Sequence, residues 1–110
     1  VYVHIEAPDE MGHQGLISEK IEAIRYVDEK VIGPVTAALE DAGAEYRILI
    51  LPDHPTPIAT RTHSSEPVPY LLYDSRKVQI GADAYNEKSG NASGITWKDG
   101  YKLINHLLEI

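Results

Sequence analysis

Hydrophobic and polar positions change their period along the chain and so predict strands and helices in turn. The opening residues VYVHIEAP are β-branched and aromatic, which is typical of a strand ending at Pro8. From Ile17 to Val31 apolar residues recur at intervals of three and four, as expected of a helix with one apolar face. A second helical segment restarts at Gly33-Pro34 and stops at Gly43. The run AEYRILIL then predicts a strand buried on both faces.

Strand, helix and strand in this order predict a right-handed βαβ unit. The expected fold class is therefore α/β, with a mostly parallel sheet and flanking helices. Residues 52–69 contain five prolines and no helical periodicity, so we expect a long ordered loop, which in compact domains is usually functional. The segments VPYLLYD and KVQIG are short strand candidates, and ADAYNEKSGNASG is rich in turn residues. A last helix is expected from Trp97 to Leu108, capped by Thr96.

Composition narrows the classes of function. The 110 residues, 43% hydrophobic and 25% charged, are enough for one globular domain or part of one. A formal charge of −7 argues against nucleic acid or an anionic membrane as partner, and no apolar run reaches the ~20 residues that span a bilayer. Cysteine is absent, which agrees with a cytoplasmic location and leaves oxygen and imidazole as the available metal ligands. Because the chain opens inside a predicted strand without Met, we expect a fragment of a longer chain.

Three polar clusters lie beyond the predicted strands. Asp9 and His13 follow the first strand, Asp53 and His54 follow the second, and His63 lies further along the loop. In open parallel α/β sheets, ligand sites form outside the carboxyl ends of the strands. The clusters are therefore expected to meet at one edge of the sheet.

The residue types in these clusters favour a metal site. An Asp-x-x-x-His spacing lets a carboxylate and an imidazole reach one ion if the intervening turn is tight, and Gly12 makes such a turn easy. Pro52 and Pro55 restrict the backbone around the Asp-His pair and so reduce the entropy lost when ligands gather. Mixed carboxylate and imidazole ligands suit manganese, zinc or iron better than calcium. Taken singly, however, a loop histidine is usually solvated and a turn aspartate usually caps its own backbone.

The segments VYVHIEAPDEMGHQG and LPDHPTPIATRTHSSEPVP together resemble the C-terminal metal-binding half of the cofactor-independent phosphoglycerate mutases. The likeness is to the archaeal-type branch, within the alkaline phosphatase superfamily, and it covers most of residues 1–75. It implies that residues 1–110 are the C-terminal portion of an alkaline-phosphatase-like domain whose N-terminal, nucleophile-bearing portion is absent. It also implies a cytoplasmic glycolytic isomerase that interconverts 3- and 2-phosphoglycerate through a phosphoserine.

The resemblance further implies a site for two divalent metal ions. By position, Asp9, His13 and His63 match the ligands of one ion, and Asp53 and His54 match two ligands of the second. Manganese is favoured, with zinc, cobalt or magnesium as alternatives. The nucleophilic serine and a further aspartate are expected upstream, so no catalytic residue is assigned in this chain. The expected partners are a phosphoglycerate and the missing N-terminal part, and the chain alone is expected to be inactive.

Two alternatives stay open at the level of sequence. The chain could belong to another phosphotransferase or phosphatase of the same superfamily, some members of which carry names such as homoserine kinase. It could also be a small non-catalytic α/β binding module whose Asp and His clusters are surface polar groups. The second alternative predicts that these side chains diverge in space and that metal leaves the melting temperature unchanged.

Overall fold

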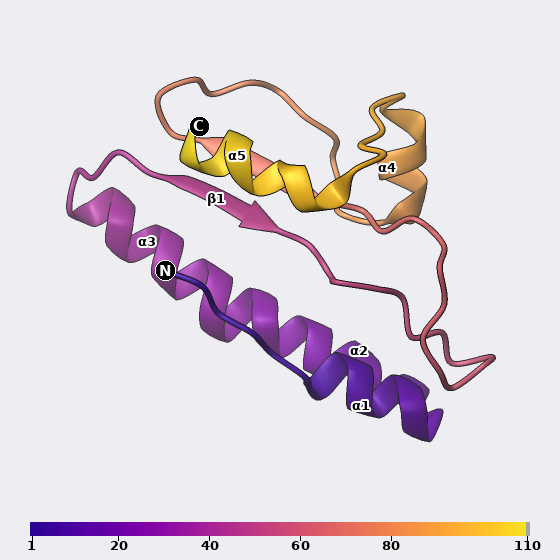
Figure 1. Cartoon of the computed structure of the whole chain (residues 1–110). Coiled ribbons are helices and arrows are strands. Elements are labelled where there is room, and N and C mark those ends of the chain that lie inside the picture. Colours follow the sequence, from indigo (N-terminus) through magenta and orange to yellow (C-terminus); the bar gives the residue numbers. More distant parts are fainter. Residues whose placement is uncertain (110) are drawn as a thin grey trace. The chain divides into compact units, whose positions relative to one another are not determined.

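The computed structural model describes residues 1–109, and these form two compact units (Figure 1). The first unit comprises Val1–Ala44 and His54–Pro67, and the second comprises Glu45–Asp53 and the described residues from Val68 onward. Helices make up the regular structure of the first unit: α1 (Ala7–Gln14), α2 (Ile17–Val27), the π-helix η1 (Asp28–Ile32) and α3 (Gly33–Asp41).

Helix α1 replaces both the end of the predicted first strand and the polar turn after it. Pro8 lies in the first turn, where its missing N–H is no loss, and Asp9 in the same turn suits the helix dipole. Gly15 ends the helix at φ 68°: its N–H donates to Gly12 O, and the next N–H, of Leu16, donates to Met11 O. This pair of bonds is a Schellman motif, which requires the left-handed conformation that glycine adopts without strain.

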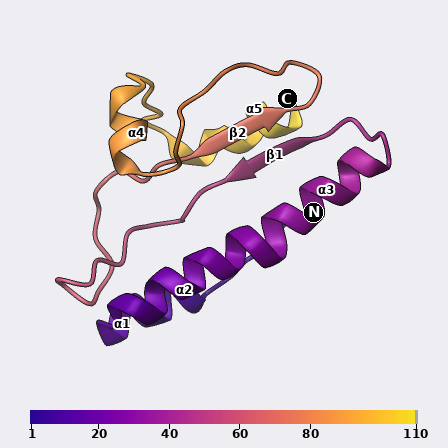
Figure 2. The same cartoon turned by 180° about the vertical axis from the view of Figure 1, so that it is seen from behind.

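Helices α2, η1 and α3 follow one another without an intervening loop, and α3 begins at Gly33 with Pro34 in its first turn, so the predicted restart at Gly33-Pro34 is confirmed (Figures 1 and 2). Proline has no N–H and its ring clashes with the carbonyl four residues earlier, which would normally kink a helix. Here the turn widens instead, with the Gly33 N–H reaching back five residues to Asp28 O. A π-turn absorbs the proline in this way. The predicted stop is confirmed, since Gly43 has φ 64° and the Ala44 N–H donates to Leu39 O.

The second unit contains the only strand pair found among residues 1–109, and the pair is antiparallel (Figure 2). Strand β1 (Arg47–Ile50) pairs with β2 (Leu71–Asp74), with Ile48 opposite Tyr73. Within the described chain the parallel character of the expected sheet is therefore not found. The remaining elements of this unit are α4 (Glu87–Ala92), the 3-10 helix η2 (Gly100–Lys102) and α5 (Leu103–Leu108).

Two expected strands and part of an expected helix are missing. Residues 1–6 and 77–81 have strand-like composition but no regular structure. A strand forms only when a neighbouring backbone satisfies its N–H and C=O groups, and in the described chain neither segment has such a partner strand. The expected helix from Trp97 begins only at Gly100, with η2, so Thr96 does not cap it. A different helix, α4, has a side-chain cap: Asn86 accepts a hydrogen bond from the Ser89 N–H.

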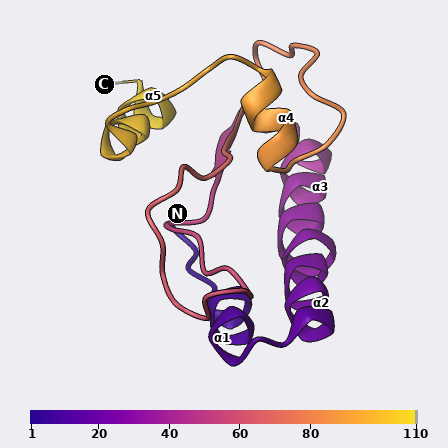
Figure 3. The same cartoon turned by 90° about the vertical axis from the view of Figure 1, so that its right-hand side faces the viewer.

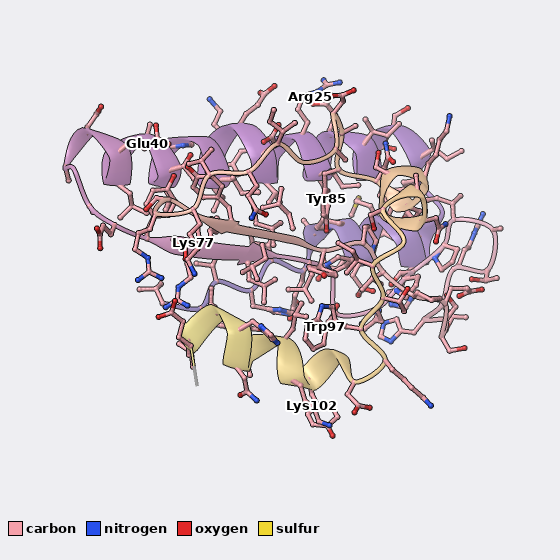
Figure 4. All side chains as sticks on the ribbon, turned by 90° about the horizontal axis from the view of Figure 1, so that it is seen from above. Arg25, Glu40, Lys77, Tyr85, Trp97 and Lys102 are labelled. Atoms are coloured by element: carbon pink, nitrogen blue, oxygen red, sulfur yellow. The ribbon has the colours of Figure 1, made fainter. Side chains whose placement is uncertain are left out.

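Few apolar side chains of the described residues are buried. Leu103, on α5, is 3% exposed, and the ring of Trp97 lies beside the same helix, with its centroid 4.4 Å from that of His106 (Figure 4). The stripe predicted on α2 faces solvent, with Ile21 52% exposed and Ile24 54% exposed. Among residues 1–109, no helix combines the length and the apolar character needed to cross a bilayer.

Candidate metal centre

Helix α1 places the first two predicted ligands on one face. Residues four apart lie one above the other on a helix, so Asp9 and His13 point the same way without needing a tight turn. The distance from His13 Nε2 to Asp9 Oδ1 is 3.3 Å. The helix therefore supplies the geometry that the sequence pattern attributed to a turn at Gly12.

The third predicted ligand, His63, comes from the loop of residues 54–67, which returns to α1 (Figure 3). His63 Nε2 lies 3.1 Å from Asp9 Oδ1 and 3.2 Å from His13 Nε2. The loop is shaped by its own backbone: the Arg61 N–H donates to Pro57 O, and Arg61 has φ 55°, a left-handed conformation unusual for a side chain of this size. Such strained positions persist where the surrounding structure holds them and are frequent at functional sites.

The separations of these three atoms suit ligands of one ion. Two ligands about 2.1 Å from a divalent ion are about 3.0 Å apart at an octahedral angle and about 3.4 Å apart at a tetrahedral angle. The observed edges of 3.1, 3.2 and 3.3 Å fall between these limits. Among residues 1–109, the group of Asp9, His13 and His63 is the only set of three or more such side chains close enough to hold a metal ion.

Electrostatics favours a cation at the same place. His13 Nδ1 lies 2.9 Å from the Arg61 carbonyl oxygen and donates to it, so the hydrogen-bond pattern assigns the proton to Nδ1. His13 Nε2 then directs a lone pair toward His63 Nε2 and the Asp9 carboxylate. Three electron-rich atoms this close need a proton or a metal cation between them. A backbone carbonyl that fixes the tautomer of a ligand histidine is a common feature of metal sites.

Asp9 is held by Thr56, which sequence reasoning did not single out. The Thr56 hydroxyl donates to Asp9 Oδ1 at 2.5 Å, and this hydrogen bond is the main cause that lowers the pKa of Asp9 below its ordinary value. Partial burial opposes the shift, while the imidazoles of His13, His63 and His54 act in the same direction as Thr56. A carboxylate that stays ionised at neutral pH is what a metal ligand requires.

Thr56 is itself enclosed by α1 and α2. Its side chain is 5% exposed, and its carbonyl oxygen accepts a hydrogen bond from Lys20 Nζ at 2.6 Å. Gly12 is buried against the same oxygen, so closely that a Cβ at position 12 would lie 2.5 Å from it. Gly12 therefore permits close approach of helix and loop. A threonine between two prolines directly after Asp-His was the signal available in the sequence.

The predicted second pair of ligands is divided between the two units. His54 belongs to the first unit, where its ring centroid lies 3.6 Å from that of His63. Asp53 is the last residue of the segment Glu45–Asp53 in the second unit and is exposed. The structure thus brings four of the five predicted ligands together, and the place of Asp53 in the site stays a prediction. The convergence is opposite to the divergence expected of a non-catalytic module with scattered surface groups.

The histidines left out of the predicted site lie elsewhere. His4 is exposed, stacked on Tyr2 and 3.8 Å from a Glu6 carboxylate oxygen. It is not an interior histidine, because residues 1–6 form no strand that would bury it. His106 lies in the last turn of α5, as expected for an imidazole at a helix C-terminus.

Comparison with known proteins places the chain in a family. The family model described as the metalloenzyme superfamily matches residues 1–109. The chain is 46% identical over 108 residues to the 2,3-bisphosphoglycerate-independent phosphoglycerate mutase of Methanothrix thermoacetophila, covering 98% of this chain and 28% of that protein. It is 51% identical over 109 residues to 2,3-bisphosphoglycerate-independent phosphoglycerate mutase 2 of Methanothermobacter thermautotrophicus, covering 99% of this chain and 27% of that protein.

A probable enzyme of the same name from Geobacter sulfurreducens is 42% identical over 110 residues, which are 99% of this chain and 27% of that protein. The chain therefore spans a little over a quarter of the length of these relatives. No solved structure gives a significant match.

Proposed function

The chain belongs to the metalloenzyme superfamily, and from this premise we propose that it supplies metal ligands to a 2,3-bisphosphoglycerate-independent phosphoglycerate mutase. Such an enzyme would interconvert 3- and 2-phosphoglycerate through a phosphoserine. The observation that carries the proposal is the convergence of Asp9, His13 and His63 to within 3.1–3.3 Å of one another. Support for the activity comes from the relatives of that name, which match nearly the whole chain.

In this proposal the chain supplies ligands to two divalent ions. Asp9, His13 and His63 would hold the first, and Asp53 and His54 would contribute two ligands to the second. When bound, the ions supply positive charge that polarises phosphoryl oxygens and lowers the pKa of an attacking hydroxyl. Manganese is the favoured ion, because carboxylate and imidazole ligands suit it, and zinc, cobalt and magnesium are the alternatives to be tested.

Hydrogen bonds within the chain orient the predicted ligands without metal or substrate. The Arg61 carbonyl holds the proton of His13 on Nδ1, so that Nε2 faces Asp9 and His63. The hydrogen bond from Thr56 lowers the pKa of Asp9 and orients its carboxylate. Ligands that are already oriented lose little conformational entropy on binding, and this preorganisation favours binding of both metal and phosphorylated substrate.

The rest of the active site is assigned to other parts of the protein. The relatives are more than three times longer than this chain, and none of its serines lies in a context that matches the nucleophile. We therefore assign the nucleophilic serine, and the strands that would extend the sheet in a parallel arrangement, to segments outside these residues. Because the substrate is a soluble metabolite, a cytoplasmic location belongs to the same proposal.

A chimaera tests the proposal directly. The 110 residues would replace the matching segment of the Methanothrix thermoacetophila protein. We expect Mn²⁺-dependent conversion of 3-phosphoglycerate to 2-phosphoglycerate, lost in the His13→Ala variant and retained in the His106→Gln variant, which alters a histidine away from the site. A chimaera that folds and binds Mn²⁺ yet hydrolyses simple phosphomonoesters without isomerising phosphoglycerate would favour a phosphatase of the same superfamily.

A second measurement concerns the 110 residues alone. They are expected to bind Mn²⁺ in calorimetric titration but to show no transfer of phosphate between the glycerate hydroxyls. Mutase activity of the isolated chain would show that the assignment of the nucleophile to another segment is wrong, without affecting the metal ligands.

A further inference from the structure

One hydroxyl group lies between ligands assigned to two different ions. Thr56 Oγ1 is 2.5 Å from Asp9 Oδ1 and 3.4 Å from His54 Nδ1. Asp9 is assigned to the first ion and His54 to the second. Thr56 is also the only polar residue among residues 1–109 that is buried as a whole, with 5% exposed, so its hydroxyl has little access to bulk water.

The donor and acceptor roles at this hydroxyl are determined by its neighbours. An ionised carboxylate only accepts, so the Thr56 proton goes to Asp9. A hydroxyl that has given its proton away can still accept, and the group facing it from the other side is His54 Nδ1. The Pro55 carbonyl oxygen, 3.3 Å from the same nitrogen, is also an acceptor. Both contacts therefore place the proton of His54 on Nδ1, which makes Nε2 the nitrogen with a lone pair for a metal.

The Thr56 backbone is held as firmly as its side chain. Lys20, on α2, donates from Nζ to the Thr56 carbonyl oxygen at 2.6 Å. Gly12, on α1, leaves no space between helix and loop, since a Cβ there would lie 3.0 Å from Thr56 Cγ2 as well as 2.5 Å from the carbonyl oxygen. The Thr56 backbone is therefore fixed by α1 and α2, and the hydrogen bond to Asp9 orients its hydroxyl.

We propose that Thr56 is a positioning residue shared by both predicted metal sites, orienting Asp9 toward one ion and His54 toward the other. The inference rests on the proposed function, because it takes the two residues as ligands of neighbouring ions. It adds a dependence between the sites: loss of one hydroxyl should weaken both. A threonine that served packing alone would be replaceable by valine, which has nearly the same shape.

The experiment compares three variants of the 110-residue chain. Thr56→Val removes the hydroxyl and keeps the shape, Thr56→Ser keeps the hydroxyl, and Thr60→Val removes an exposed hydroxyl of the same loop that bonds only to loop carbonyls. Titration calorimetry with Mn²⁺ and with Zn²⁺ gives the affinities, and circular dichroism gives the metal-free melting temperature. Loss of an outer hydrogen bond to a metal ligand typically lowers affinity about 10- to 100-fold.

We expect that fall in affinity for Thr56→Val, with Thr56→Ser restoring metal binding and Thr60→Val leaving it unchanged. If Thr56→Val binds Mn²⁺ and Zn²⁺ as tightly as the original chain does, the inference is overturned and the proposed function stands. If the unaltered chain binds neither Mn²⁺ nor Zn²⁺, the proposed function fails and this inference fails with it.

A tautomer measurement keeps the inference testable if Thr56→Val does not fold. In ¹⁵N-histidine-labelled protein without metal, the ring nitrogen shifts of His54 should show the proton on Nδ1. The same tautomer should persist in Thr56→Ser. A proton on Nε2 of His54 in the unaltered chain would overturn the inference, because the Thr56 hydroxyl would then not orient this ligand.

Discussion

Gly12→Ala should displace the loop that carries Thr56 and His63, because the added methyl group has no room. A Cβ at position 12 would lie 2.5 Å from the Thr56 carbonyl oxygen and 3.0 Å from both Thr56 Cγ2 and Lys20 Nζ. The Lys20 ammonium ends a flexible side chain and can swing aside. The Thr56 carbonyl is backbone, so the contact is relieved only if the loop itself retreats.

The size of the effect follows from the overlap. A close contact between carbon and oxygen is about 3.3 Å, so the loop must withdraw by about 0.8 Å. Overpacking of this kind costs about 1–3 kcal/mol, while the higher helix propensity of alanine returns about 1 kcal/mol. The expected net loss is roughly 0–2 kcal/mol, and each 1 kcal/mol corresponds to a fall in melting temperature of about 4–8 °C in a small domain. Because Asp9 is held by Thr56, Mn²⁺ affinity should fall as well.

Thermal melts and Mn²⁺ titrations of two glycine variants test this reasoning. Gly90→Ala is the matched control: Gly90 is also helical, in α4, but a Cβ there would lie 3.7 Å from Pro69 Cβ, an ordinary contact. Gly90→Ala should therefore raise stability by about 1 kcal/mol through helix propensity alone. The argument is refuted if Gly12→Ala melts at or above the unaltered chain and binds Mn²⁺ equally well.

Three further outcomes are expected. His63→Ala should lower Mn²⁺ affinity by more than about 100-fold while leaving the metal-free melting temperature nearly unchanged, since this ligand is exposed; unchanged affinity would exclude it from the site. Mn²⁺ at about a hundredfold excess over its Kd should stabilise the chain by about 2.7 kcal/mol, and EDTA should abolish the gain; a melting curve indifferent to both would contradict a metal site. The hydrogen bond from Arg76 lowers the pKa of Asp74 in the folded chain from 3.8 to about 2. The stabilisation of the fold by this interaction is complete at pH values above the pKa of Asp74 in the unfolded chain, and it is lost as pH falls from about 4 to about 2. Urea unfolding should accordingly show that Asp74→Asn is less stable than the original chain above about pH 4, and that this difference vanishes below about pH 2. A stability difference that grows on acidification would contradict a lowered pKa of Asp74.

Local sequence signals predicted the long helices well and two of the four expected strands, those that became β1 and β2. The three- and four-residue spacing from Ile17 onward needs no distant partner to indicate a helix, and α2 begins at Ile17. Residues 1–6 are equally strand-like in composition, but a strand depends on hydrogen bonds to another segment, which composition does not report. The polar stretch after Pro8, which the sequence pattern predicts as a turn, is mostly helical. Its helix-starting features, a proline and an acidic first turn, were the better guide.

The sequence predicted which side chains are candidate ligands, but not which residues hold those side chains in place. Asp9, His13 and His63 are residue types that bind metals, and their order along the chain carried the resemblance. Thr56 is a weak ligand type, and its importance arises from a contact with a residue 47 positions away. Lys20 likewise matters through a backbone carbonyl. Partners of this kind are found only when the fold brings the segments together.

The two kinds of ligand in this centre differ in how they come together during folding. The pair on α1 is assembled as soon as two helical turns exist, whereas His63, 50 positions after His13, reaches the pair only when the loop of residues 54–67 closes onto α1. The dissociation rate of a bound cation would therefore be set by local opening of the loop of residues 54–67, while the helices stay folded. Exchange kinetics of the ion would then report a local opening event rather than global unfolding.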